Sequence, residues 1–269
     1  MTTTSNWPVA LPPCLTVERQ QTVAVLALSR PEKRNSLSDE LVLGLQTFYS
    51  SIPDDVTAVV MHGAGDNFCA GLDLNEVKES DARKSLNTSL IGQRLNDTIQ
   101  YLSVPVIAVL RGAVIGGGLE LAAAAHIRVA EPSAYFALPE GIRGIFLGSG
   151  GSVRLPRLIG TARVMDMMLT GRSHAAEDAY RMGLFQYLVG PDEGLAKGLE
   201  LALAASRNAP LANYAIIQGL PRIVEEGPHN GLFTEALMST LAQSDEEAKR
   251  RLRDFLDRKM NKVARPDGA

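Results

Sequence analysis

The sequence predicts an α/β fold with a helical C-terminal part, and two patterns carry that prediction. Up to about residue 190, short runs of β-branched and other apolar residues alternate with segments of helical character, which indicates strands and helices that share one core. From Asp192 onward almost every segment has a helical pattern. The 269 residues are enough for one large α/β domain, or for such a core with an appended helical piece.

The expected strands are short apolar runs, several of them bounded by turn residues. A tight turn at residues 19–21 joins the first two strands. The stretch before Glu140 is expected to be an apolar loop. The predicted strands are residues 15–18, 22–29, 56–61, 105–110 and 127–130.

The expected helices begin at capping residues or at glycines. Ser38 is the expected N-cap of the first helix, and Ser244 is expected to cap a charged helix near the C-terminus. Breaks between helices are expected at residues 208–210 and 226–228, each of which ends in a proline. The predicted helices are residues 38–49, 83–102, 117–125 and 244–259.

Composition and charge argue against several classes of protein. The net charge of −3 gives no general attraction to nucleic acid or to an anionic membrane surface. No apolar stretch approaches the ~20 residues of a membrane span, and the N-terminal residues lack the basic and apolar regions of a secretory signal, so a cytoplasmic location is expected. Cys14 and Cys69 form no CxxC pair and the histidines lack ligand spacing, so no metal site is expected.

Two glycine-bearing loops each follow a predicted buried strand. The first covers residues 67–74, and the second covers 112–121 and opens a helix with three consecutive glycines, 116–118. Backbone N–H groups at a helix start are unpaired and lie at the positive end of the helix dipole, which favours an anion or a developing oxyanion. A tight strand–helix turn packed against a neighbour fits the same pattern.

Two acidic residues stand in apolar surroundings. Glu120 lies in the first turn of the alanine-rich helix, and Glu140 follows the apolar run Tyr-Phe-Ala-Leu-Pro. Burial raises the pKa of a carboxyl toward neutrality, where it can act as a general acid or base. Taken alone, Glu120 is better explained as a charge that the helix dipole favours.

These segments resemble, in order, three motifs of the crotonase superfamily of enoyl-CoA hydratases and isomerases. Residues 68–74 match F-x-A-G-x-D followed by an apolar residue, residues 112–121 match G-x-x-x-G-G-G-x-E-L, and residues 136–140 match F-x-x-P-E. A later L-T-G-R…G-L stretch at 169–172 and 183–184 matches as well. The correspondence covers about residues 15–260, which is nearly the whole chain.

The resemblance implies a spiral of ββα units with a C-terminal helical trimerisation region. Residues 1–13 are then a loose N-terminal segment, residues 14–191 the crotonase core that binds acyl-coenzyme A, and residues 192–269 the oligomerisation region. It also implies a homotrimer or a dimer of trimers. No separate cofactor is implied, because coenzyme A is part of the substrate.

The resemblance further implies hydration of a 2-enoyl-CoA thioester through an enolate. The N–H groups of Ala70 and Gly117 would form the oxyanion hole, where losing one donor costs roughly 100- to 1000-fold in rate. Glu120 would activate the water, and Glu140 would give a proton to the Cα atom.

Other residues are expected to contact the substrate. Lys33 and Arg34 stand where the family holds the adenine and phosphates, although a solvated loop fits them too. Phe255 and Arg258 match a C-terminal stretch that reaches a neighbour's coenzyme A, although a packing helix explains them as well. Asp73 is expected to stabilise its own loop. The remaining loop residues expected at the substrate are Ala70, Gly71, Leu72, Gly116 and Gly117.

One departure concerns the acyl group. Leu147 replaces the proline that the family commonly carries just before the glycine of its G-x-x-P-G stretch, so the acyl specificity stays open. Two alternatives to hydration also stay open. One is Δ3,Δ2-enoyl-CoA isomerisation or other enolate chemistry on an acyl-CoA, and the other is a non-catalytic acyl-CoA-binding role.

Overall fold

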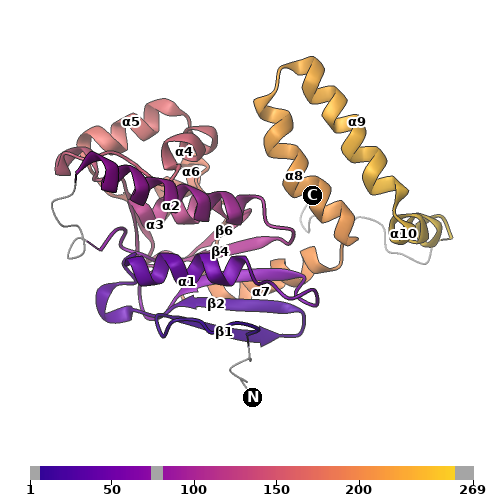
Figure 1. The fold of residues 1–269 in the computed structure, drawn as a ribbon, viewed down its shortest axis with the longest axis horizontal. Helices are drawn as coiled ribbons and strands as arrows, with labels where there is room; N and C mark the ends of the chain where they lie inside the picture. The colour runs from indigo at the N-terminus through magenta and orange to yellow at the C-terminus, as the bar shows by residue number, and fades with distance from the viewer. Residues whose placement is uncertain (1–6, 74–80, 258–269) are drawn as a thin grey trace. The chain divides into compact units, whose positions relative to one another are not determined.

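The computed structural model describes residues 7–73 and 81–257. The chain divides into two compact units, Met1–Ser206 and Arg207–Ala269, and each is described by itself (Figure 1). The division after Ser206 leaves one more helix with the first unit than a boundary at 191/192 does, and the predicted oligomerisation role of 192–269 stays a prediction. No helix within the described ranges is long and apolar enough to cross a membrane.

A six-stranded sheet forms the centre of the first unit, with the strand order β1-β2-β3-β4-β6-β9. The first two strands pair antiparallel and the others pair parallel. Every residue of β2 and β4 is buried, as expected for parallel strands covered on both faces. The strands are β1 Leu15–Gln20, β2 Val23–Leu28, β3 Ala58–Gly63, β4 Val106–Leu110, β6 Ile127–Ala130 and β9 Tyr187–Leu188.

The predicted strands are therefore confirmed, with shifts at the first turn and at β3, which covers Ala58–Gly63 where 56–61 was predicted. β1 continues to Gln20, so the turn consists of Gln21 and Thr22 and not of residues 19–21. Gln21 has a φ of 55°, which lets the chain reverse in two residues.

A second, three-stranded sheet carries the segments that the motifs single out. Its order is β5-β7-β8, with β5 Ala113–Ile115, β7 Tyr135–Ala137 and β8 His174–Ala175. The expectation of a loop before Glu140 is wrong, because 135–137 pairs with β5 on one side and with β8 on the other. This pairing brings the start of the alanine-rich helix and the segment of Glu140 to the same edge.

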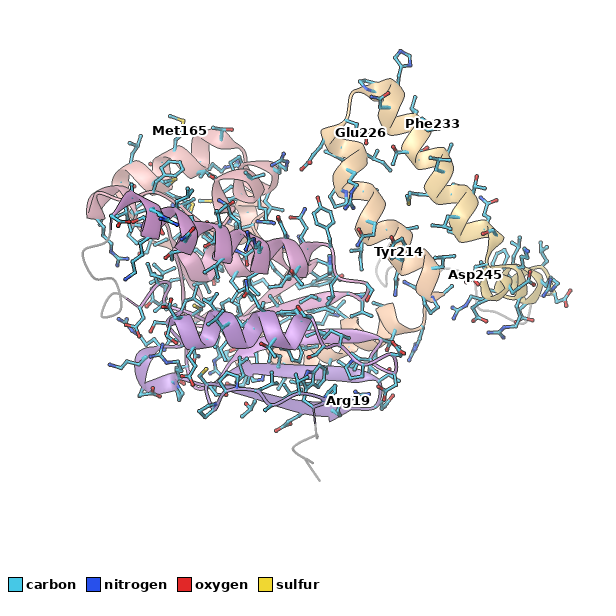
Figure 2. All side chains as sticks on the ribbon, in the orientation of Figure 1. Arg19, Met165, Tyr214, Glu226, Phe233 and Asp245 are labelled. Carbon is cyan, nitrogen blue, oxygen red and sulfur yellow. The ribbon has the colours of Figure 1, made fainter. Side chains whose placement is uncertain are left out.

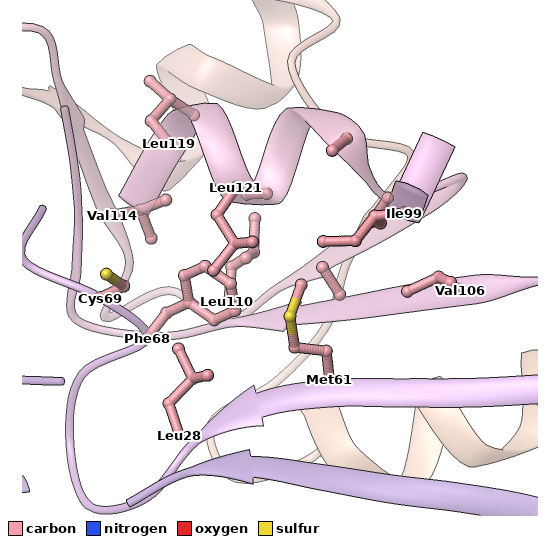
Figure 3. Close-up of a cluster of buried hydrophobic side chains, with 14 of the residues drawn as sticks. Leu28, Met61, Phe68, Cys69, Ile99, Val106, Leu110, Val114, Leu119 and Leu121 are labelled. Atoms are coloured by element: carbon pink, nitrogen blue, oxygen red, sulfur yellow. The ribbon is translucent and has the colours of Figure 1, made fainter. Parts of the chain in front are cut away.

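Helices cover both faces of the large sheet. In Figure 1, α1 and α2 lie along one face. Apolar side chains of α3 belong to the core cluster on this side of the sheet. Leu28, Met61 and Leu121 meet in that core (Figure 3). On the opposite face α7 packs its leucines on a second apolar cluster. The helices are α1 Asp39–Tyr49, α2 Ala82–Gln100, α3 Gly117–Ala124, α4 Gly151–Ile159, α5 Thr161–Thr170, α6 Ala176–Met182 and α7 Gly194–Ser206, with short 3-10 turns at η1 Pro31–Lys33 and η2 Gly141–Arg143.

The second unit contains three described helices, α8 Pro210–Glu225, α9 Pro228–Ser244 and α10 Glu246–Leu256. The predicted breaks are confirmed, since α8 and α9 each begin at a proline. The predicted cap is wrong: Ser244 ends α9, and Asp245 caps α10 by accepting a hydrogen bond from the Glu247 N–H. Tyr214 and Phe233 are among its exposed apolar side chains (Figure 2).

Candidate active site

The first glycine-bearing loop is held by the chain segment before α1. The Ala70 N–H donates to the Arg34 carbonyl at 3.0 Å, and the Asp73 N–H donates to the Leu37 carbonyl at 2.9 Å. In return, the Leu37 N–H donates to the Gly71 carbonyl at 2.8 Å. The loop is therefore aligned by this segment as one strand is aligned by another.

This alignment corrects the predicted oxyanion donor. The Ala70 N–H is engaged by Arg34 and does not point into the site. The Leu72 N–H makes no hydrogen bond within residues 7–73 and 81–257, and its nitrogen lies 3.7 Å from the place where a Cβ on Gly117 would stand. Leu72, which had been expected only as a substrate contact, is therefore the available donor.

The second loop supplies the other donor. Gly117 is the first residue of α3, so no carbonyl of the helix can accept from its N–H. Its nitrogen lies 3.5 Å from where a Cβ on Gly71 would stand, which places it beside the first loop. The backbone N–H groups of Gly117 and Leu72 thus lie near each other at the positive end of α3.

The run of glycines has a steric cause. Gly116 has a φ of 53°, and a Cβ there would lie 2.4 Å from Oε1 of Glu140. A Cβ on Gly118 would lie 2.3 Å from the carbonyl oxygen of Cys69. The two loops can approach this closely only where no side chain intervenes (Figure 3 shows Cys69 beneath the start of α3).

Glu120 is fixed by backbone donors from the start of α4. It is 4% exposed, and its Oε1 accepts hydrogen bonds from the N–H groups of Ser149 and Gly151, each at 2.8 Å. Burial raises the pKa of the Glu120 carboxyl, and the backbone donors and the Arg154 guanidinium oppose that rise. Its geometry is thus set by an element that follows in sequence.

Glu140 lies at the start of η2, immediately beyond β7. It is 6% exposed, and its Oε2 is buried with no hydrogen-bond partner among the described residues. Burial raises the pKa of the Glu140 carboxyl, and the charge of Glu120 raises it further. The structure therefore brings the two acids close enough to influence each other.

Two polar residues that sequence reasoning missed support the first loop. The amide of Asn35 donates to the carbonyls of Ala64 and Asn67, at 2.9 and 2.7 Å, and accepts from the Arg30 N–H at 2.8 Å. Asn67 Oδ1 accepts from the Ala113 N–H at 2.9 Å and so ties the first loop to the second. Asn35 has a φ of 54°, and the preference of asparagine for this conformation is the signal that sequence reasoning can use.

Asp73 was expected to stabilise its own loop, and the structure pairs it with a residue outside that loop. It is 4% exposed and forms a 3.0 Å ion pair with Arg30. Arg30 also donates to the carbonyl of Ser36 at 2.7 Å, so the pair joins the loop to the segment before α1.

The other predicted contact residues lie at the surface or beyond the described residues. Lys33 and Arg34 are exposed at η1. Phe255 is 49% exposed on α10 of the second unit, and Arg258 lies outside the described residues. Their contacts with coenzyme A stay predictions. No group of three or more potential metal ligands occurs in the described part of the chain.

The loop beyond Glu140 carries the departure noted in the sequence. Leu147 is buried, at 6% exposure, while Ile145 and Phe146 before it are 49% and 70% exposed. Its effect on the acyl group stays a prediction.

Known proteins match this chain along nearly its whole length. The family model for enoyl-CoA hydratase/isomerase matches residues 18–263. A 2,3-dehydroadipyl-CoA hydratase of Escherichia coli is 34% identical over 91% of this chain and 96% of its own length. A short-chain-enoyl-CoA hydratase of Clostridium acetobutylicum is 30% identical, over 90% and 94%.

Solved structures agree with these relatives. A protein from Rhodopseudomonas palustris CGA009 is 56% identical and superposes with a TM-score of 0.90, covering 93% of this chain and 97% of its own. An enoyl-CoA hydratase from Bacillus anthracis is 29% identical, with a TM-score of 0.86 and coverages of 91% and 96%. The chain therefore has the crotonase fold and belongs to the enoyl-CoA hydratase/isomerase family.

Proposed function

We propose that the protein hydrates a 2-enoyl-CoA thioester. The observation that carries this proposal is the pair of buried carboxyls, Glu120 and Glu140, together with the neighbouring backbone N–H groups of Leu72 and Gly117. Hydration needs an acid, a base and a place for negative charge on the thioester oxygen. Relatives named as hydratases match this chain at 30% and 34% identity.

In the proposed reaction, water adds to Cβ of the enoyl group while the thioester becomes an enolate. Glu120 accepts a proton from the attacking water, and the N–H groups of Leu72 and Gly117 stabilise the negative thioester oxygen. Glu140 gives a proton to Cα, which restores the thioester. Proton exchange between the two carboxyls then returns both to their starting states.

The environment of each carboxyl fits its proposed role. A general acid must hold its proton at working pH, and burial together with the charge of Glu120 raises the pKa of Glu140 in that direction. Glu120 keeps hydrogen bonds from two N–H groups, which favour its charged form and so its use as a base.

Hydration is tested by the loss of enoyl-thioester absorbance with short, medium and aromatic 2-enoyl-CoAs. We expect turnover with at least one of them, and a fall of about 100- to 10,000-fold in kcat for Glu120→Gln and for Glu140→Gln. Glu177→Gln, an exposed change on α6, is the matched control and should behave as the wild type. No turnover with any substrate would refute the proposal.

Isomerisation between Δ3- and Δ2-enoyl-CoA is a second candidate, and one observation favours it. Glu140 Oε2 accepts no hydrogen bond in the part of the chain that the structure describes, so one carboxyl is free to carry a proton between two carbons. In an isomerase, activity with a 3-enoyl-CoA should survive Glu120→Gln and fail with Glu140→Gln. In a hydratase, hydration should fail with both.

Binding of the coenzyme A part is proposed for Lys33 and Arg34 at η1, with Phe255 and Arg258 reaching it from a neighbouring subunit of a trimer. Both Lys33→Ala and Arg34→Ala should raise the Kd for coenzyme A, because each removes a positive charge from the phosphate region. Light scattering on the full chain measures whether it forms a trimer or a hexamer.

A non-catalytic relative would bind coenzyme A equally well when both glutamates are changed to glutamine.

A further inference from the structure

One face of α2 carries four polar side chains at helical spacing. Gln93, Asn96, Asp97 and Gln100 are three or four residues apart, so they share one side of the helix. Residues at this spacing on a helix are usually apolar and pack against the core. Here the stripe faces the chain segment 148–154, which includes the start of α4.

Each member of this polar stripe holds that segment. The Asn96 amide donates to the Ser149 carbonyl at 2.8 Å, and the Gln93 amide donates to the Gly148 carbonyl at 3.1 Å. Arg154 of α4 donates to Asp97 and to Gln100, each at 2.5 Å.

The same turn holds Glu120 on its other side. The Ser149 N–H donates to Glu120 Oε1, while the Ser149 carbonyl accepts from Asn96. A Cβ on Gly92 of α2 would lie 2.3 Å from Ser149 Oγ, so the helix and the turn are in close contact. One residue, Ser149, therefore connects the stripe to the carboxyl.

We infer that Asn96, assisted by Gln93 and Arg154, is a positioning residue that sets the direction of the Glu120 carboxyl through the Ser149–Gly151 turn. Two N–H groups of this turn hold Oε1 of the carboxyl. The inference rests on the proposed function, since orientation of Glu120 affects rate only if Glu120 acts on water. A misplacement of about 1 Å can cost on the order of 100-fold in rate.

A purely structural role explains Asn96 less well. The residue is 2% exposed, and its Oδ1 is buried with no hydrogen-bond partner among residues 7–73 and 81–257. An unsatisfied buried acceptor is destabilising, and an apolar side chain of similar size avoids it. What asparagine supplies here is the 2.8 Å amide donor toward the Ser149 carbonyl, which accepts a second, longer hydrogen bond from Arg154 at 3.4 Å.

The pKa of Glu120 offers a readout that packing alone would not change. Burial raises it, while the N–H groups of Gly148, Ser149 and Gly151 and the Arg154 guanidinium lower it. The acidic groups nearby are Glu140, whose own pKa Glu120 raises, and Asp97, which is paired with Arg154. If the turn loses its alignment, burial dominates and the pKa of Glu120 rises.

The experiment compares Asn96→Ala, Asn96→Asp and Gln93→Ala with the wild type. For both Asn96 variants we expect kcat for 2-enoyl-CoA hydration to fall roughly 10- to 100-fold with KM little changed, and the acidic limb of the pH profile to move to higher pH. Gln93 is exposed, so its variant should fold normally and show the same shift at smaller size. Asn87→Ala, an exposed asparagine on the same helix, is the matched control.

A second readout does not depend on activity. Carboxyl 13C NMR of glutamate-labelled protein, with Glu120→Gln for assignment, reports the pKa of Glu120 directly. We expect it to be higher in Asn96→Ala and Gln93→Ala than in the wild type and Asn87→Ala. An unchanged pKa of Glu120 in folded variants overturns the inference. So does a change in KM with no change in kcat. If the wild type hydrates no 2-enoyl-CoA, the proposed function fails. The NMR measurement of the Glu120 pKa still decides whether the polar stripe sets the direction of the Glu120 carboxyl.

Discussion

The two carboxyls of the site are held in contrasting ways. Glu120 lies in the first turn of α3, and its Oε1 is fixed by the N–H groups of Ser149 and Gly151. Glu140 lies at the start of η2, and its Oε2 accepts no hydrogen bond from the described residues. Both are almost fully buried and both have a raised pKa. Burial is thus shared, and the hydrogen bonding of the two carboxyls differs.

This contrast fits the two chemical roles that we propose for the carboxyls. A carboxyl that orients water benefits from a fixed direction, and backbone N–H donors can supply it without another charged group. A carboxyl that transfers a proton to carbon must be able to hold that proton, and hydrogen bonds to its charged form would work against this. Four predictions test whether the contrast is real.

The largest expected effect comes from adding a methyl group beside each acid. The Gly116→Ala Cβ would lie 2.4 Å from Glu140 Oε1, and the Gly151→Ala Cβ would lie 2.5 Å from Glu120 Cγ. Each should lower kcat by about 100-fold or more, because each displaces one carboxyl from its place. Gly160→Ala also has a positive φ but has open space around it, so it controls for backbone strain. Activity near the wild-type value in Gly116→Ala would show that Glu140 is not confined there.

The next effect concerns the coupling of the two charges. Glu120→Gln removes a negative charge that raises the pKa of Glu140, so that pKa should fall toward its ordinary value. A carboxyl 13C titration of the variant measures it. A Glu140 pKa that stays in place would mean that the carboxyls act independently.

A smaller effect is expected on stability. The pKa of Glu140 is raised in the folded state, so the folded protein binds this proton more tightly than the unfolded chain does. Its contribution to stability is complete below the unfolded pKa and is lost as pH rises through the folded pKa. Glu140→Gln should therefore raise Tm above neutral pH, by about 2–4 °C for each kcal/mol gained, with the gain vanishing near pH 4. If Tm at pH 8 were lower for Glu140→Gln than for the wild type, this would contradict a buried Glu140 Oε2 without a hydrogen-bond partner.

The smallest effect concerns His126, which lies outside the candidate site. Its pKa is lowered, whereas the pKa values of the two carboxyls are raised. Burial lowers the pKa of His126 to about 4, and its Nδ1 accepts from the Val106 N–H at 2.8 Å. Its contribution to stability is present above the ordinary value of 6.5 and is lost as pH falls toward 4. NMR titration of the imidazole should give a midpoint near 4. A midpoint near 6.5 would place this ring in solvent.

Much of the fold follows from local pattern. The strands around 22–29, 56–61 and 105–110 are apolar on both faces, and such runs are buried in a parallel sheet wherever they occur. The Ser38 cap is likewise local, since its hydroxyl accepts from an N–H three residues on. By contrast, 135–137 is too short to show a strand pattern, and it becomes one only because β5 and β8 flank it.

In the candidate site, too, some features follow from the sequence and others only from the tertiary structure. The order of the motifs was enough to single out Glu120, Glu140 and the glycine run, because side-chain chemistry and the need for glycine are written in the residues. It pointed to Ala70 as the oxyanion donor, and the structure contradicts this, since the free N–H of a loop depends on which distant segment takes the others. Here the segment around Arg34 and Leu37 takes them.

By itself, then, the sequence determined which chemical groups the protein possesses: two acids in apolar segments, two glycine-bearing loops and an alternation of strands and helices. Only the tertiary structure decided how they are directed: Leu72 as the donor, Glu120 held through Ser149, and Glu140 left without a partner at Oε2. The physical reason is that hydrogen bonds and burial are pairwise and non-local. Each direction was set by a partner remote in the chain, and no pattern within a segment records that partner.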